Sequence, residues 1–130
     1  MEYSFTPEQL DRIETILAED LIEVGANSVI FIDMAGNIIA RCDNGESDHD
    51  VYSLAALGAG NFGAVNAMAN IIGEDEFSLL FHKGQEKSMH FSKVNGDFLL
   101  IILFGKDISL GFLRLKVAEA ANKLRDVWEH

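Results

Sequence analysis

Apolar residues recur every three or four positions near both ends of the chain, which predicts an amphipathic helix in each place. The first stripe covers residues 10–24. Thr6 is a candidate cap for this helix, and Pro7 occupies its first position, where a missing N–H costs nothing. The second stripe covers residues 110–127 and follows Ser109, another candidate cap. We therefore expect one helix at each end of the chain.

Between these helices lie shorter apolar or alternating runs bounded by turn residues, which predict strands over residues 29–32, 38–42, 77–82, 88–94 and 98–104. Asn95-Gly96 is a strong two-residue hairpin signal. The last run is apolar throughout, so we expect it at the centre of the sheet. The links between consecutive strands are short, so the sheet should be antiparallel. The predicted fold is α+β, a single domain over residues 1–130 with the order α-β-β-α-β-β-β-α and five antiparallel strands between helices.

The middle helical segment, residues 51–73, is unusual because it carries no charged residue. An ordinary surface helix has charges on its outer face. A helical wheel places one set of side chains against the sheet: Leu54, Gly58, Phe62, Val65, Met68 and Ile72. The opposite set is small or uncharged, and we expect it to contact a second subunit or a partner protein, because small side chains let another backbone approach: Ala56, Ala59, Gly60, Gly63, Asn66, Ala67 and Asn70.

This segment also contains Gly58-Ala59-Gly60-Asn61-Phe62-Gly63, a literal match to the G-x-G-x-x-G nucleotide-binding pattern. That pattern works at a turn between a strand and a helix N-terminus, where free N–H groups meet a pyrophosphate. Here the residues before the glycines are already helical in character. We therefore expect no nucleotide, and no other cofactor, at this site. A membrane span is disfavoured as well, since glycines and asparagines make the segment weakly apolar and acids flank both ends.

The chain is acidic, with a net charge of −11, and residues 1–50 carry −10 of it. No basic stripe is present, so nucleic acid is not an expected partner. A single cysteine, Cys42, excludes an internal disulfide, and the start lacks the pattern of a signal peptide. These features favour a cytoplasmic protein.

We identify no catalytic or metal-binding constellation. Asp43, Asp48 and Asp50 do not have the spacing of a calcium loop. His82 and His90 lie on adjacent predicted strands and could face one another, but no metal-ligand motif accompanies them. We interpret them as strand residues, and Cys42 as a core thiol.

Four stretches together resemble one known family, that of the Roadblock or dynein-light-chain domains. They are Leu54-Ala55-Ala56-Leu57, the segment from Glu76 to Gly84, the strand from Leu99 to Phe104, and the segment from Leu110 to Lys116. Residues 51–118 are most similar to the bacterial gliding-polarity regulators within it. The combination of these stretches with the order of elements carries the resemblance.

The resemblance implies a homodimer in which edge strands join to form one continuous sheet, with the middle helices side by side. The joining strand would be Phe77, Ser78, Leu79, Leu80, Phe81 and His82. The implied partner is a Ras-like small GTPase, for which the chain would be a non-catalytic regulator or scaffold able to stimulate GTP hydrolysis. No arginine lies in the middle helix, so at most an indirect GTPase-activating role is implied.

A second hypothesis stays open from the order of elements alone. Profilin-like and PAS-like sheets have similar orders, so the chain could be a small-ligand sensor. Such a sensor would need a pocket within the monomer, bordered by the glycine-containing helix.

Overall fold

The computed structural model of the protein describes residues 5–45, 49–77 and 80–129. The predicted order of elements is confirmed. The first helix, α1 (Pro7–Ile16), begins as expected at Thr6. The Thr6 hydroxyl accepts the Gln9 N–H at 3.1 Å, and the Gln9 side chain accepts the Thr6 N–H at 2.8 Å. Two of the free N–H groups at the helix start are satisfied in this way.

The helix does not end at Ile16 but continues as one stretch of π-helix, η1 (Leu17–Ile22). Leu17 and Leu21 both stay fully buried in this wider turn. The apolar spacing of the sequence is similar for the two helix types, which is why only the structure distinguishes them.

The five strands form one antiparallel sheet in the order β2-β1-β5-β4-β3. The bounds are β1 (Ser28–Asp33), β2 (Ile38–Asp43), β3 (Leu80–Lys83), β4 (Ser88–Asn95) and β5 (Phe98–Phe104). As expected, β5 is the central strand, and all its residues are buried.

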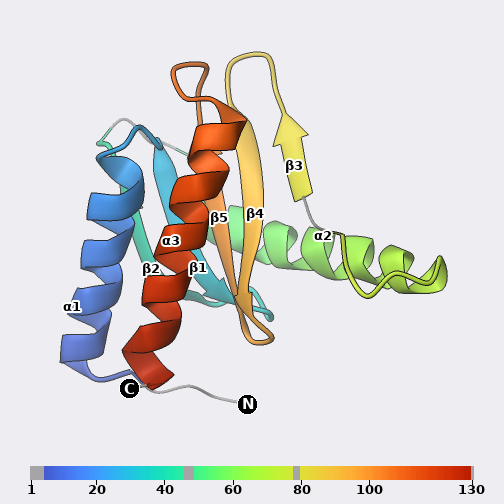
Figure 1. Ribbon diagram of the computed structural model, residues 1–130, viewed down its shortest axis with the longest axis horizontal. Coiled ribbons are helices and arrows are strands. Elements are labelled where there is room, and N and C mark those ends of the chain that lie inside the picture. Colours follow the sequence, from blue (N-terminus) through green and yellow to red (C-terminus); the bar gives the residue numbers. More distant parts are fainter. Residues whose placement is uncertain (1–4, 46–48, 78–79, 130) are drawn as a thin grey trace.

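Helices cover both faces of the sheet (Figure 1). One face packs against α1, η1 and α3 (Leu110–Glu129), and the other against α2 (Val51–Ile71). Alternate residues of β5 serve the two layers: Leu100 and Ile102 belong to the α1–α3 core, while Leu99 and Ile101 belong to the α2 core. This alternation follows from the period of two along a strand.

The α2 helix runs across the strands, and its C-terminal part extends past β3, beyond the edge of the sheet (Figure 1). Most of its buried residues lie near its start, where it crosses the central strands, although Ala69 near its end is buried as well. Helix α2 thus packs on the sheet mainly through its first half.

Candidate protein interface on α2 and β3

The start of α2 is held in place by local hydrogen bonds. The Asp50 carboxylate accepts the N–H groups of Tyr52 and Ser53, each at 3.1 Å, and the Ser53 hydroxyl at 2.7 Å. The Ser53 hydroxyl, more than any other group, lowers the pKa of Asp50. The guanidinium of Arg41 lies 5.8 Å from the centre of the Tyr52 ring. These contacts fix the N-terminal turn beside strand β2.

The sheet-facing side of α2 differs from the helical-wheel prediction. Ala59, expected on the outer side, is 8% exposed and belongs to the core beneath the helix. The buried residues in the first half of α2 are Val51, Ala55, Gly58 and Ala59, so the helix turns mostly small side chains toward the sheet. Gly58 sets this close approach, because a Cβ built there would lie only 2.6 Å from Ile101 Cδ1.

Met68 and Ile72 were also placed on the wrong side by the wheel. They were expected against the sheet, yet they are 54% and 68% exposed. The wheel assumes a sheet beneath the whole helix, whereas this part of α2 lies past β3 (Figure 1). Helix length was the signal available in the sequence: twenty-one residues span about 31 Å, more than five strands at about 4.8 Å spacing.

Apart from Ala59, most of the residues predicted on the outer side of α2 are exposed to solvent. Asn66 is half-buried, and the other predicted residues are exposed: Ala56, Gly60, Gly63, Ala67 and Asn70. A Cβ at Gly60 or Gly63 would meet no atom within 4 Å. The contact that these glycines were predicted to permit is therefore not made within the monomer.

Large apolar side chains adjoin this smooth strip, and sequence reasoning did not identify them as exposed. Leu57 and Ile71 are 73% and 82% exposed. An exposed apolar surface of this kind is characteristic of protein interaction sites. We call the exposed outer side of α2, together with strand β3, the α2–β3 surface.

Strand β3 is an edge strand, as predicted, and pairs only with β4 in the described part of the chain. It begins at Leu80 and includes Lys83, so Phe77 lies before it, which corrects the predicted bounds. Ser78 and Leu79, two other residues of the predicted edge, lie outside the described residues. On β3, the Phe81 ring stacks on Phe104 at a centroid distance of 5.9 Å.

His82 connects the edge strand to α2. Its Nε2 atom lies 3.0 Å from Asn61 Nδ2. The expectation that His82 and His90 could face one another is wrong, because β3 pairs Phe81 with His90 and His82 with Met89. Residues offset by one position along paired strands point to opposite faces of a sheet.

The remaining predicted positions carry no site among the described residues. No group of three or more His, Cys, Asp or Glu side chains there could hold a metal ion. Asp43 accepts the Gly45 N–H and Asp50 caps α2, while Asp48 lies outside the described residues. Cys42 is half-buried against the α1–α3 core. No helix within the described ranges is long and apolar enough to cross a bilayer.

Comparisons with known proteins place this arrangement among solved structures. Residues 13–104 match the family model of the Roadblock/LC7 domain. A structure of the gliding protein MglB from Thermus thermophilus is similar with a TM-score of 0.87 and 27% identity, over 99% of this chain and 98% of that one. Myxococcus xanthus MglB is similar with a TM-score of 0.83 and 30% identity, over 98% and 95% of the two chains.

An MglB structure with a tetrameric arrangement is also similar, with a TM-score of 0.88 and 27% identity over 99% of this chain and 98% of that one. Schizosaccharomyces pombe profilin has a TM-score of 0.64 at 13% identity over 88% of this chain and 98% of its own, a likeness of fold alone. None of the curated proteins compared with the chain matches it.

Proposed function

Because this chain belongs to the Roadblock/LC7 domain family, we propose that it is a non-catalytic homodimeric regulator or scaffold that binds a Ras-like small GTPase. The observation that carries the proposal is the α2–β3 surface, where an uncharged helix face with exposed Leu57 and Ile71 adjoins strand β3, whose outer edge has no partner strand in the described part of the chain. The similarity to MglB gliding proteins along almost the whole chain supports the class of function.

The proposed dimer joins two copies along β3 and lays their α2 helices side by side. An unpaired strand edge presents free N–H and C=O groups that favour pairing with another chain. The open space beside Gly60 and Gly63 gives a second helix room to approach. The partner GTPase would then dock on the paired α2 helices.

Any effect on GTP hydrolysis would be indirect. Arginine fingers act by placing a guanidinium on the transferring phosphoryl group, and α2 contains neither arginine nor lysine. Arg41, on β2, lies over the Tyr52 ring. The chain would therefore alter hydrolysis by repositioning residues of the GTPase itself.

The alternative function, a small-ligand sensor of profilin or PAS type, has less support. The profilin likeness has low sequence identity and shows only the shared fold. A sensor would be expected to work as a monomer with a ligand pocket, so the mass of the native protein in solution separates the two functions.

The proposal is tested with Gly63→Arg, which places a long charged side chain on the open strip of α2. We expect the variant to retain its fold and to lose binding to GTP-loaded Ras-like GTPases from the source cell by at least tenfold. Binding is measured by calorimetry and dimer mass by sedimentation, with GTP hydrolysis followed in parallel.

Glu14→Arg is the matched control, because Glu14 is exposed on α1 at the other face of the sheet. It should leave both binding and mass unchanged. A loss of binding in Glu14→Arg with none in Gly63→Arg would move the docking surface to the α1–α3 face. A native protein that is monomeric at tens of micromolar would contradict the dimer.

A further inference from the structure

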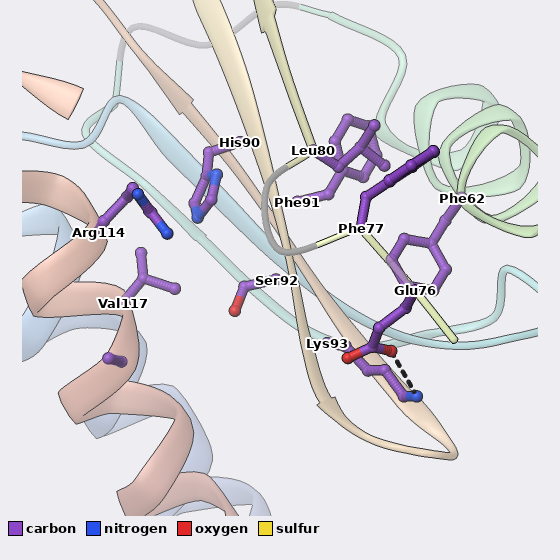
Figure 2. Close-up of a pocket in the computed structure, with 11 residues that line it drawn as sticks. Phe62, Glu76, Phe77, Leu80, His90, Phe91, Ser92, Lys93, Arg114 and Val117 are labelled. Atoms are coloured by element: carbon purple, nitrogen blue, oxygen red, sulfur yellow. Dashed lines mark hydrogen bonds and ion pairs between the residues drawn. The ribbon is translucent and has the colours of Figure 1, made fainter. Parts of the chain in front are cut away.

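An ionisable side chain is buried beneath helix α3. His90, on β4, has only 5% of its surface exposed. Its paired residues on the two neighbouring strands are Phe81 of β3 and Ile102 of β5, and both pack in the α1–α3 core. Arg114 and Val117 of α3 lie across a cleft from the ring (Figure 2). The imidazole therefore lies between α3 and the edge of the sheet, with almost no access to water.

The hydrogen bonds of the His90 ring indicate which protonation state the fold accommodates. One ring nitrogen bonds to the Leu80 backbone at the start of β3. The other, Nδ1, is buried and has no hydrogen-bond partner in the described part of the chain, so the Ser92 hydroxyl on the same face of β4 does not bond to it. A neutral imidazole has a single N–H, whereas a protonated one has two. The arrangement therefore suits the neutral ring, whose one N–H links β4 to β3.

The charged groups around the ring do not offset a second proton on it. Arg114, the charged residue of α3 at the cleft, has the same sign as a protonated imidazole. The carboxylate at the other end of the cleft, Glu76, already contacts the Lys93 ammonium at 3.0 Å. Strand β5 carries no ionisable residue, and β3 contributes only His82 and Lys83, which are exposed and carry no negative charge. Protonation would thus bury a charge that no described residue balances, at a considerable cost in free energy.

Strand β3 is the element whose movement would most readily expose the ring to water. It has four residues and pairs with β4 alone in the described part of the chain. Beyond that ladder, Phe81 stacks on Phe104, and the His82 ring lies 3.0 Å from the Asn61 amide. A short edge element with few contacts opens at a lower free energy than the whole domain. Separation of β3 from β4 would therefore hydrate His90 without unfolding the rest of the chain.

We propose that protonation of His90 opens the edge of the sheet by releasing β3 from β4. At neutral pH the unprotonated ring packs beneath α3 and bonds to Leu80. The protonated ring is stable only where water reaches it, so acid favours the state in which β3 has moved away. This opening requires neither the dimer nor the proposed GTPase function. Because β3 is also the proposed dimer edge, acid should weaken self-association over the same range of pH.

The direction of the pH effect follows from the shifted pKa of His90. Burial lowers this pKa, the Leu80 hydrogen bond opposes the change, and the charge of exposed Arg114 adds to it. A histidine that the fold favours in its neutral form gives stability that is present above the unfolded pKa, about 6.5, and lost as pH falls toward the folded value. Between about pH 7.5 and about pH 5.5, one such histidine raises the opening constant of β3 at most about tenfold.

Amide hydrogen exchange of the full chain at these two pH values, corrected for the intrinsic exchange rate, measures the opening of β3. We expect the protection of the His82 and Met89 amides, which are paired across β3 and β4, to fall by about threefold to tenfold at the lower pH. NMR titration of the ring in the native chain should give His90 a pKa below about 6.5. Unchanged protection of these amides, or a His90 pKa at or above that value, would overturn the proposal.

His90→Gln removes the titrating group and keeps an amide that can bond to Leu80. The protection of β3 in this variant should be the same at both pH values. His82→Gln is the matched control, because it removes an exposed histidine of β3 itself, and the ratio of its protections at the two pH values should equal that of the native chain. A pH dependence that persists in His90→Gln, or disappears in His82→Gln, would assign the effect to another group and overturn the proposal.

Sedimentation at the same two pH values tests the consequence for assembly separately. The dimer dissociation constant should rise at the lower pH in the native chain and stay constant in His90→Gln. If the protection of β3 falls while the dissociation constant does not change, the subunits do not join along β3, and the proposed dimer is wrong although the role of His90 holds.

Discussion

At the scale of single residues, a glycine in the β1–β2 turn shapes the α2 layer. Gly36 has a φ of 90°, and a Cβ there would lie 3.0 Å from the Ala56 Cα of α2. Gly73 has nearly the same φ, 89°, but open space around it. The two positions thus share a backbone requirement and differ in packing, which makes them a matched pair.

Gly36→Ala should therefore lower the free energy of unfolding by at least about 1 kcal/mol more than Gly73→Ala. Urea unfolding of the two variants measures the difference. If both variants lose the same free energy of unfolding, the β1–β2 turn does not pack closely against α2.

Asp33 forms several hydrogen bonds within the same turn. Its carboxylate accepts the N–H of Ala35 at 3.0 Å and two N–H groups of Asn37, each at 2.9 Å. Burial raises the pKa of Asp33, but these hydrogen bonds together outweigh it and lower the pKa below its usual value. A depressed pKa in the folded state gives stability that is present above the unfolded pKa and lost as pH falls through the folded one.

We therefore expect the free energy of unfolding to fall more steeply between about pH 5 and pH 2 in the native chain than in Asp33→Asn. Unfolding curves at several pH values provide the measurement. Parallel pH profiles would show that Asp33 is not hydrogen-bonded in this way in solution.

At the scale of elements, β3 decides whether the sheet can extend into a second copy. The Gly84 N–H donates to the Lys87 carbonyl at 3.0 Å, which closes the β3–β4 hairpin. Hydrogen-bonded pairs alternate along an antiparallel ladder, and β3 pairs Lys83 with Ser88 and His82 with Met89. His82 should thus bond to β4, while the Lys83 N–H points away from the sheet.

Lys83→Pro removes that outward N–H and leaves the β4 ladder intact. We expect the dimer dissociation constant to rise about tenfold, since one backbone hydrogen bond contributes roughly 0.5–1.5 kcal/mol. Lys83→Ala, which keeps the N–H, should dimerise like the native chain. If sedimentation gives one dissociation constant for both variants, the subunits do not join along β3.

At the scale of the whole molecule, the two faces of the sheet have different surfaces. On one face, α1 and η1 lie beside α3, and the Lys123 ammonium of α3 contacts Asp20 of η1. On the other face, α2 extends past the sheet (Figure 1). Its side chains Leu57 and Ile71 are exposed. We therefore expect the α2 face of the sheet to be the one that a second subunit covers.

Ile71→Ser should weaken self-association at least tenfold, because burying an isoleucine contributes roughly 1.5–3 kcal/mol. Leu115→Ser is the control, since Leu115 is 57% exposed on α3. Sedimentation of both variants at several concentrations is the measurement. Loss of the dimer only in Leu115→Ser would place the interface on the α1–α3 face.

Much of the architecture follows from local patterns in the sequence. Thr6 and Gln9 specify the first helix start through short-range hydrogen bonds, and the continuous apolar run of β5 identifies it as central. The absence of charge on α2 pointed to a contact surface, and most of the small residues assigned to it are exposed. These features depend on neighbours within a few positions or on a simple period.

Tertiary packing decided how α2 is rotated on the sheet, how the strands are paired, and which residues of α3 and β4 meet. The sequence could not show that α2 rolls to bury Ala59, because this depends on the fit of Gly58 against Ile101. Pairing register placed His82 and His90 on opposite faces, since a shift of one residue reverses a side chain. Arg114 and His90 are far apart in sequence, so only the packing of α3 on β4 brings them to the same cleft.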